Sequence, residues 1–513
     1  MESNSITPLL AKLKIPSDYA RTEFVNTNPI PELEAWGRTA GDVLQQIPAL
    51  VKARGGANQD GNRQEGEDGN KDDHEEGGDQ PNIDLSLGIQ ADLLFAVAPF
   101  VSVGFLKDMA NGEDGRVGDP GAGNEDVQRE TKEEETRSEH RDLWITTTAE
   151  AAAQDILLSI DELHNPPHAL ISHVLSQKLR PIFRTNPHPH VNEATGRKID
   201  RAAGGTMAMQ DYYDAQQWKQ FPGIAKVLLW CVRHIDKDAY ENVWHLVVPP
   251  LMALLDDYEA AYKLQGVFIV QEMLLHVPKD VLKRTGVGAL FKQSLRKCLS
   301  HLQSPETPEL LKHAIDASVS LILLVTTPSP VRPSAERFDE LSSLLGEGII
   351  TGIWLYSGDK PDVVQATFDA LPGLLAALDV GSTRFLKPLV PQLMHTLIPQ
   401  PLLKPDRHLQ LSAIRVLDTL VDVCKARLPA WKETLLDGVA RCWVGCVDEE
   451  NNKAAYEATV TSEDVSLRRE VKLKLVALCG KVSVALPTVK EEEYPMFLQA
   501  DRTLFQDIFG SVA

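Results

Sequence analysis

Apolar residues recur at helical spacing almost without interruption from residue 211 to the C-terminus. In one stretch, Leu264, Phe268 and Leu275 fall on one face of a helix, with Val267 and Val270 beside them. This spacing indicates amphipathic helices, whereas a half-buried strand would alternate every second residue, and no such run of any length is present. The pattern therefore predicts an all-α fold.

Three short motifs divide this region at comparable intervals: TPEL at 307–310, KPDV at 360–363 and KPDR at 404–407. A proline in the first helical turn loses no hydrogen bond, and an acid beside it favours the helix dipole. Counting a further corner at Asp256, the corners lie about 50 residues apart, slightly above the roughly 40–47 residues of HEAT and armadillo units. We expect a HEAT/armadillo-like α-solenoid of antiparallel helix pairs, because no single pair can bury its apolar face alone.

The N-terminal region has a different composition. Two stretches rich in Gly, Asn and acids cannot bury enough apolar surface to fold and are expected to be disordered acidic inserts. The expected organisation is an N-terminal helical segment at 1–50, an insert at 51–82, a docking helix at 83–107, a second insert at 108–142, helices with a Pro/His/Gly-rich connector at 143–210, and the repeat array at 211–513.

The net charge of −21 argues against a nucleic-acid binder, because phosphate contacts need Lys and Arg. The two inserts carry −12 of that charge, so the remaining chain is only mildly acidic. The six cysteines are scattered along the chain, which indicates buried thiols in a protein of a reducing compartment. No secretory signal and no apolar run of roughly 18 residues is evident, so we expect no membrane contact and a cytoplasmic location, with the nucleus as a second option.

The stretch LLDDYEAAYK at 254–263 holds three carboxylates that could be a catalytic or metal site. The spacing also suits a helix corner. Asp256 lies three residues before Glu259, as in a capping box, and Glu259 lies four residues before Lys263, as in a helical ion pair. The sequence favours the corner, with Asp256 accepting the amide of Glu259.

Around this corner a Trp precedes PPL, and LLDD, K-x-x-G, HVP and RTG then follow in that order. These motifs and their order closely resemble those of the Tel-two-interacting protein two family. The matching residues are Trp244, Pro249, Pro250, Leu251, Leu254, Leu255, Asp256, Asp257, Lys263, Gly266, His276, Val277, Pro278, Arg284, Thr285 and Gly286. Upstream, RPIF at 180–183, TGRK at 195–198 and the run from Trp218 to Trp230 are also similar, and the resemblance covers about 175–450.

The resemblance implies an all-helical, non-catalytic scaffold subunit of the Triple-T complex. That complex works with the ninety-kilodalton heat-shock chaperone to mature and stabilise phosphatidylinositol-3-kinase-related kinases. It implies a direct contact with Tel-two-interacting protein one, and indirect contacts with Tel-two, the chaperone machinery and the kinases. The signature residues carry over as structural only: Trp244, Pro249, Pro250, Asp256, Asp257, Glu259, Lys263, Gly266 and Pro278.

Other candidate sites have simpler explanations. His164, His168 and His173 are interrupted by two prolines and lack a Cys or carboxylate to complete a zinc site. Cys442 and Cys446 share a helical face, where packed thiols are more common than ligands. The chain lacks phosphate-loop, GxSxG and HExxH motifs. We therefore expect no enzyme activity, no cofactor and no metal.

Two alternative functions remain open. The first is an armadillo-type transport adaptor that binds basic peptides. Such adaptors place Asn four residues after Trp, whereas His234, Val248, Gly358 and Val447 stand at those positions here. The second is a hydrolase that uses Asp256 and Asp257 as a catalytic pair.

Overall fold

The computed structural model describes residues 6–16, 31–60, 86–109, 145–200, 212–213, 216–326, 334–400, 403–451 and 461–510. Within these ranges every regular element is a helix, apart from an isolated antiparallel bridge between Val191 and Lys198. The all-α prediction is confirmed. Most of the two expected acidic inserts lies outside the described residues.

The chain divides into two compact units. The first contains residues up to Leu254 together with Leu275–Pro278, and the second contains Leu255–Leu274 and the chain from Lys279 onward. The helices of the first unit are α1 Ile6–Lys12, α2 Pro31–Asp60, α3 Leu87–Val97, η3 Ala98–Phe100, α4 Val103–Asp108, α6 Thr147–Ser159, α7 Asp161–His164, α8 His168–His173, η4 Val174–Leu179, α9 Arg180–Phe183, η5 Gln217–Gln220, α11 Ile224–Arg233, η6 Lys237–Ala239 and α12 Tyr240–Leu255.

The apolar segment expected as one docking helix at 83–107 is built from α3, the short turn η3 and α4. Pro99 ends the first helix, and Ser102 caps the next by accepting the amide of Phe105 at 3.2 Å. The segment packs on α6, α8 and α11. Lys226 of α11 donates to the Pro99 carbonyl oxygen at 3.1 Å. Gly223 has a left-handed φ of 78°, and a Cβ there would lie 2.7 Å from the Pro99 nitrogen, so only glycine allows this approach.

Helix α2 continues to Asp60, so it covers the first ten residues of the insert expected at 51–82. It packs along α6, which begins at a Thr146 cap.

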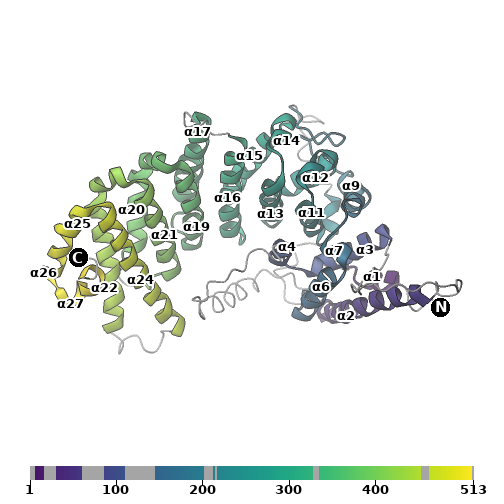
Figure 1. Cartoon of the computed structure of the whole chain (residues 1–513), viewed down its shortest axis with the longest axis horizontal. Helices are drawn as coiled ribbons and strands as arrows, with labels where there is room; N and C mark the ends of the chain where they lie inside the picture. The colour runs from purple at the N-terminus through teal and green to yellow at the C-terminus, as the bar shows by residue number, and fades with distance from the viewer. Residues whose placement is uncertain are drawn as a thin grey trace, which may run out of the picture. The chain divides into compact units, whose positions relative to one another are not determined.

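The second unit begins at the corner after α12 (Figure 1). Its helices are α13 Ala260–His276, α14 Lys279–Thr285, α15 Val287–Cys298, α16 Thr307–Val325, α17 Ala335–Ser343, η7 Leu344–Trp354, α18 Leu355–Ser357, α19 Pro361–Leu378, η8 Asp379–Phe385, α20 Leu386–Leu397, α21 Arg407–Val423, η9 Lys425–Trp431, α22 Lys432–Asn451, α24 Ser462–Ala485, α25 Pro487–Glu491, α26 Glu493–Ala500, α27 Arg502–Phe505 and η10 Gln506–Gly510.

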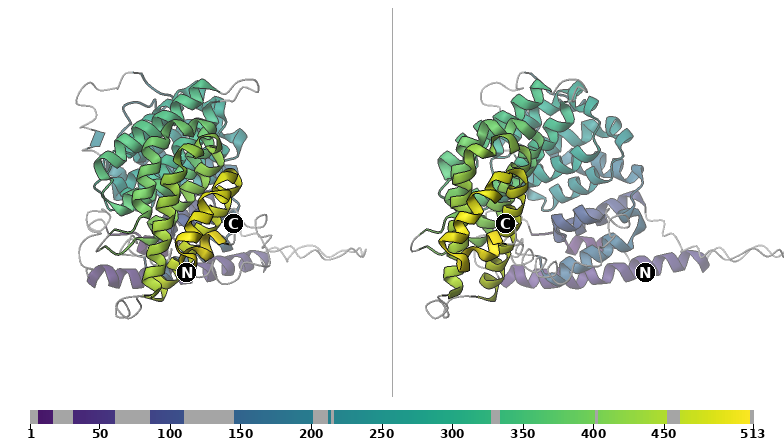
Figure 2. Two further views of the ribbon diagram at one scale, coloured as in Figure 1. Left: turned by 90° about the vertical axis from the view of Figure 1, so that its left-hand side faces the viewer. Right: turned by 60° about the vertical axis from the view of Figure 1, so that its left-hand side comes forward.

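Helices begin at all three of the motifs TPEL, KPDV and KPDR. Pro308 and Pro361 occupy the first turns of α16 and α19, and Asp406 caps α21 by accepting the amide of Leu409 at 3.0 Å. A fourth start, Thr461 with Asp464, forms a complete capping box for α24. Helix α16 packs on α19, α19 on α21, and α21 on α24, and Figure 2 shows this succession from green to yellow.

One stretch, Pro361–Leu397, is long and apolar enough to cross a membrane by length and composition alone. It is divided into α19, η8 and α20. Helix α19 buries Phe368, Leu371 and Leu374 completely while packing between α16 and α21. Helix packing accounts for its apolar composition.

Candidate functional site

The carboxylates at 256–259 form the corner that starts α13, but Asp257 is the capping residue. Its Oδ1 accepts the backbone N–H of Glu259 at 2.8 Å, and the carbonyl oxygen of Glu259 accepts the amide of Lys263 at 3.1 Å to close the first turn. The expected pairing of Asp256 with the amide of Glu259 is therefore wrong by one residue. The cap has an i to i+2 geometry, which Asp adopts readily in turns.

Asp256 instead turns toward α15. Its Oδ1 lies 3.3 Å from the Nζ of Lys297, in the last turn of that helix. The ammonium of Lys263, expected to pair with Glu259, donates to the carbonyl oxygen of Leu255 at 3.3 Å. This bond satisfies a carbonyl at the end of α12, where no further helical amide follows. The corner thus ties the start of α13 to the end of α15.

The corner is buried, with Asp256, Asp257 and Lys263 exposed by 5%, 0% and 3%. Burial lowers the pKa of Lys263, and the negative charges of Asp256 and Asp257 oppose that change. Burial also raises the pKa of the neighbouring Cys298 thiol to about 11. The ammonium of Lys263 and the carboxylates of Asp256 and Asp257 stabilise one another, because a buried charge without a counter-charge is costly.

This arrangement does not suit hydrolysis. A general acid or base must reach a substrate, whereas these carboxylates are closed within the corner. They also do not line the groove near Ile322 or the depression near Arg180. In the described ranges, no group of three or more His, Cys, Asp or Glu side chains is arranged to hold a metal ion.

The structure brings two of the signature motifs together in the first unit. Trp244 of α12 is buried, and its Nε1 donates to the carbonyl oxygen of Gly196 in the TGRK motif at 3.0 Å. Gly196 has a left-handed φ of 63°, and a Cβ there would lie 2.9 Å from the Trp244 ring. The motif forms a tight turn in which the Gly196 amide donates to the Asn192 carbonyl oxygen at 2.7 Å.

The remaining signature residues lie within helices, apart from Pro278. Pro249 and Pro250 lie inside α12, so they do not start it. Gly266 is buried within α13, and Pro278 stands between the end of α13 and the start of α14.

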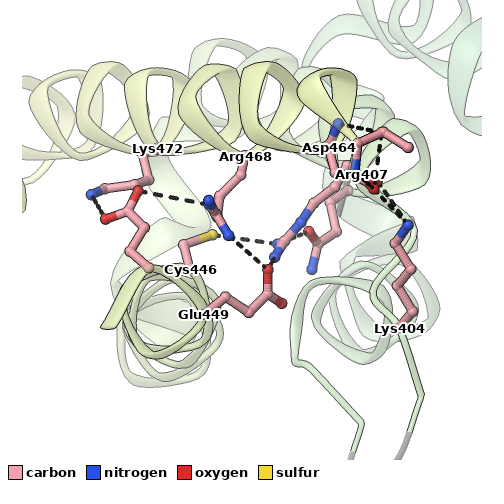
Figure 3. Close-up of polar contacts among 10 residues, drawn as sticks. Lys404, Arg407, Cys446, Glu449, Asp464, Arg468 and Lys472 are labelled. Atoms are coloured by element: carbon pink, nitrogen blue, oxygen red, sulfur yellow. Dashed lines mark hydrogen bonds and ion pairs between the residues drawn. The ribbon is translucent and has the colours of Figure 1, made fainter. Parts of the chain in front are cut away.

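A charged network that was not predicted from the sequence joins three helices of the second unit (Figure 3). Arg407 at the start of α21 and Arg468 of α24 both approach Glu449 of α22, at 2.5 and 3.5 Å. Arg407 also donates to Gln410 at 2.8 Å and to the sulfur of Cys446 at 3.4 Å. The two guanidinium side chains are only 5% and 8% exposed, so their charges depend on these partners.

Further pairs surround this network. Lys472 of α24 lies 2.8 Å from Glu450 and 4.8 Å from the centre of the Trp443 ring. Lys404 lies 2.8 Å from Asp464. The lysine contact and the two hydrogen bonds from Thr461 lower the pKa of Asp464 to about 2. The α22 and α24 helices are thereby held to the corner that begins α21.

A local signal for this network exists in the sequence. A cation in the first turn of a helix and an anion in the last turn both oppose the helix dipole. Arg407 begins α21, and Glu449 and Glu450 end α22, so each of these charges is unfavourable in its own helix. The ion pair between Arg407 and Glu449 compensates for two of them.

The thiols and histidines take structural positions. Cys442 and Cys446 are buried and free, as expected for packed thiols. A hydrogen bond from Cys442 lowers the pKa of the Cys446 thiol, and the charge of Arg407 acts in the same direction. His164 ends α7, whereas His168 and His173 belong to α8.

A model of the Tti2 family matches residues 136–403, slightly more than half of the chain. TELO2-interacting protein 2 of Rattus norvegicus is 24% identical over 161 residues, which are 30% of this chain and 30% of the rat protein. The matched region therefore spans less than a third of that relative. No solved structure matches the chain. The family match includes the corner and Trp244 and ends before Arg407.

Proposed function

Because the chain belongs to the Tti2 family, we propose that it is a non-catalytic scaffold subunit of the Triple-T complex, with Tel-two and Tel-two-interacting protein one. In this role it works with the heat-shock chaperone to mature phosphatidylinositol-3-kinase-related kinases. The family match is the observation that carries the proposal. The name of the rat relative, which describes an interaction with TELO2, supports it.

The architecture of the second unit is consistent with a scaffold. We propose that α16, α19, α21 and α24, each packed on the next, belong to a HEAT-like array of helix pairs. Such arrays present extended surfaces to partners. The buried Asp256 and Asp257 stabilise the corner and are not accessible to a substrate, which favours a structural role over hydrolysis.

The partners follow from the same proposal. Tel-two-interacting protein one binds the chain directly, and Tel-two, the chaperone machinery and the kinases associate through the complex. The complex resides in the cytoplasm, with the nucleus as a second location. A stable subunit of this kind buries at least about the 1,600 Å² of a standard interface.

The test is co-purification of the tagged full-length chain, co-expressed with Tel-two-interacting protein one and Tel-two from the same organism. We expect one peak in size-exclusion chromatography that contains all three chains in fixed ratio. Elution of the tagged chain apart from both proteins, at low as well as physiological salt, would contradict the proposal.

A second experiment tests the role in the cell. Rapid depletion of the chain should lower the protein levels of the phosphatidylinositol-3-kinase-related kinases while their messenger RNAs stay constant. Kinase levels that persist through several cell divisions would exclude the maturation role, even if the complex forms.

A further inference from the structure

A preformed groove lies within the second unit, between α15, α16 and the α17–η7 segment. Its volume is ≈ 290 Å³. The floor is apolar and includes Leu282, Leu321, Ile322, Val325 and Leu344. This volume is at the lower end of the roughly 300–1,000 Å³ of small-molecule pockets, so the groove suits a few apolar side chains better than a whole cofactor.

Small residues keep the groove open on the α15 side. Gly286 precedes α15 with a left-handed φ of 74°, and Gly288 and Ala289 follow in the first turn. A Cβ on Gly288 would lie 3.7 Å from Leu282 and 3.8 Å from Val325, at ordinary contact distances. Gly286, Gly288 and Ala289 therefore place little side-chain volume in the groove.

Polar contacts fix the opposite wall. Glu340 of α17 is paired with Lys292 and lies 3.6 Å from Arg296, both on α15. Arg296 also donates to the Ser343 hydroxyl at 2.8 Å, and Arg337 donates to the Thr326 hydroxyl at 3.0 Å. Because these bonds join the helices that form the walls, a ligand meets walls that are already ordered, and binding costs less conformational entropy.

The α15 side of the groove is basic in an otherwise acidic chain. Three cations line the groove, Lys283, Lys292 and Arg296, against the two carboxylates Glu336 and Glu340. One carboxylate, Glu340, is shared by Lys292 and Arg296. Lys283, on the rim, is exposed and forms no ion pair within the part of the chain that the structure describes. Glu336 on the far rim only partly offsets this excess of positive charge.

We propose that this groove binds an acidic amphipathic helix of a partner protein, which inserts bulky apolar side chains onto the floor and places its carboxylates near Lys283. Helices bind grooves in this way through apolar residues at i, i+3, i+4 and i+7. The contact does not depend on the proposed complex, since the full-length chain purified alone should make it.

The test measures fluorescence anisotropy with two labelled synthetic helices added to the full-length chain. Both carry Leu at i, i+3, i+4 and i+7. One has Glu and the other Lys on the polar face. We expect the Glu-faced helix to bind with a Kd below about 100 μM, and to weaken with added salt because rim charges are screened.

Two variants locate the binding. Ala289→Trp fills the mouth of the groove from an exposed position and should weaken binding at least about tenfold. Lys283→Glu reverses the rim charge and should weaken binding at least about threefold. The matched controls, Ala477→Trp and Lys474→Glu, change exposed residues of α24 and should bind like the unmodified chain.

Circular dichroism melts verify that each variant is folded. If Ala289→Trp does not fold, the affinity of Lys283→Glu tests whether the helix binds in the groove. Three results would overturn the proposal. These are equal binding of the Lys-faced helix, unchanged affinity in the groove variants, and no saturable binding of the Glu-faced helix up to about 1 mM.

Discussion

The indole nitrogen of Trp244 donates a hydrogen bond to the carbonyl oxygen of Gly196 at 3.0 Å, although 48 residues separate them in the chain. The bond holds the turn of the Pro/His/Gly-rich connector against α12. The close packing around the bond also explains why residue 196 is a glycine, since the ring and backbone of Trp244 leave no room there for a side chain.

Replacing Gly196 with Ala should destabilise the chain. The left-handed backbone costs roughly 1–2 kcal/mol for a residue with a Cβ, and the contact of 2.9 Å with Trp244 adds to that cost. The control is Gly480→Ala in α24, where a Cβ meets nothing within 4 Å. This change should stabilise by about 0.5–1 kcal/mol, since Ala favours a helix. Urea denaturation measures both, and effects of equal sign would contradict the structure.

Replacing Arg407 with Ala should destabilise the second unit by about 3 kcal/mol, since removing one partner of a buried pair leaves the other charge under-compensated. Arg468 remains beside Glu449 and keeps the loss at the lower end of the usual range. Arg441→Ala is the control, because Arg441 forms an exposed pair with Asp437 within α22. Such pairs contribute at most about 1 kcal/mol. Equal losses in denaturation experiments would refute the role assigned to the network.

The corner carboxylates have different roles, which substitutions can separate. Asp257→Ala removes the cap of α13 and should cost about 0.5–2 kcal/mol. Asp257→Asn keeps a side-chain oxygen acceptor and should cost less. Combined Asp256→Asn and Asp257→Asn substitutions should lower the melting temperature while the chain still co-purifies with Tel-two-interacting protein one. Loss of a defined enzymatic turnover at unchanged melting temperature would instead support the hydrolase.

Asp316 on α16 should make the stability of the folded chain depend on pH. Burial raises its pKa from 3.8 to about 6, opposed by Lys312 and assisted by Asp369. Above about pH 6 the carboxylate is ionised in both folded and unfolded chains, and the folded state bears the unfavourable burial. As the pH falls toward 3.8, the folded state takes up the proton first and gains relative stability. Asp316→Asn should therefore stabilise at about pH 7.5, with a smaller gain at about pH 5. A gain that grows on acidification would show that the sign is wrong.

Removing residues 61–82 and 110–142 together should leave the melting temperature and the co-purification of partners nearly unchanged. Residues 61–82 contain no aliphatic, Met, Cys, Phe, Tyr or Trp side chain, so this segment has little apolar surface to bury. A short Gly/Ser linker replaces each deleted segment, and the intact chain is the reference. Collapse of the complex would place an interface in these segments or beside α3 and α4.

Local patterns predicted the helices because their causes lie within a few residues. The corners at TPEL, KPDV and KPDR were found from a proline or an acid at a helix start, and each does precede a helix. The corner at 256–263 was also identified, but its hydrogen bonds were assigned incorrectly. Spacing alone does not show that Asp256 faces Lys297 of α15, 41 residues away. That contact leaves Asp257 to cap the helix.

The helical class, the helix starts and the family could be predicted from local patterns, since periodicity, capping and motif order are properties of neighbouring residues. The pairing of Arg407 with Glu449, the contact of Trp244 with Gly196 and the groove beside Gly288 could not. Each depends on how helices distant in the chain pack together. Burial makes an uncompensated charge or an empty space costly only after distant helices have packed together. No local pattern therefore specifies which residues will meet.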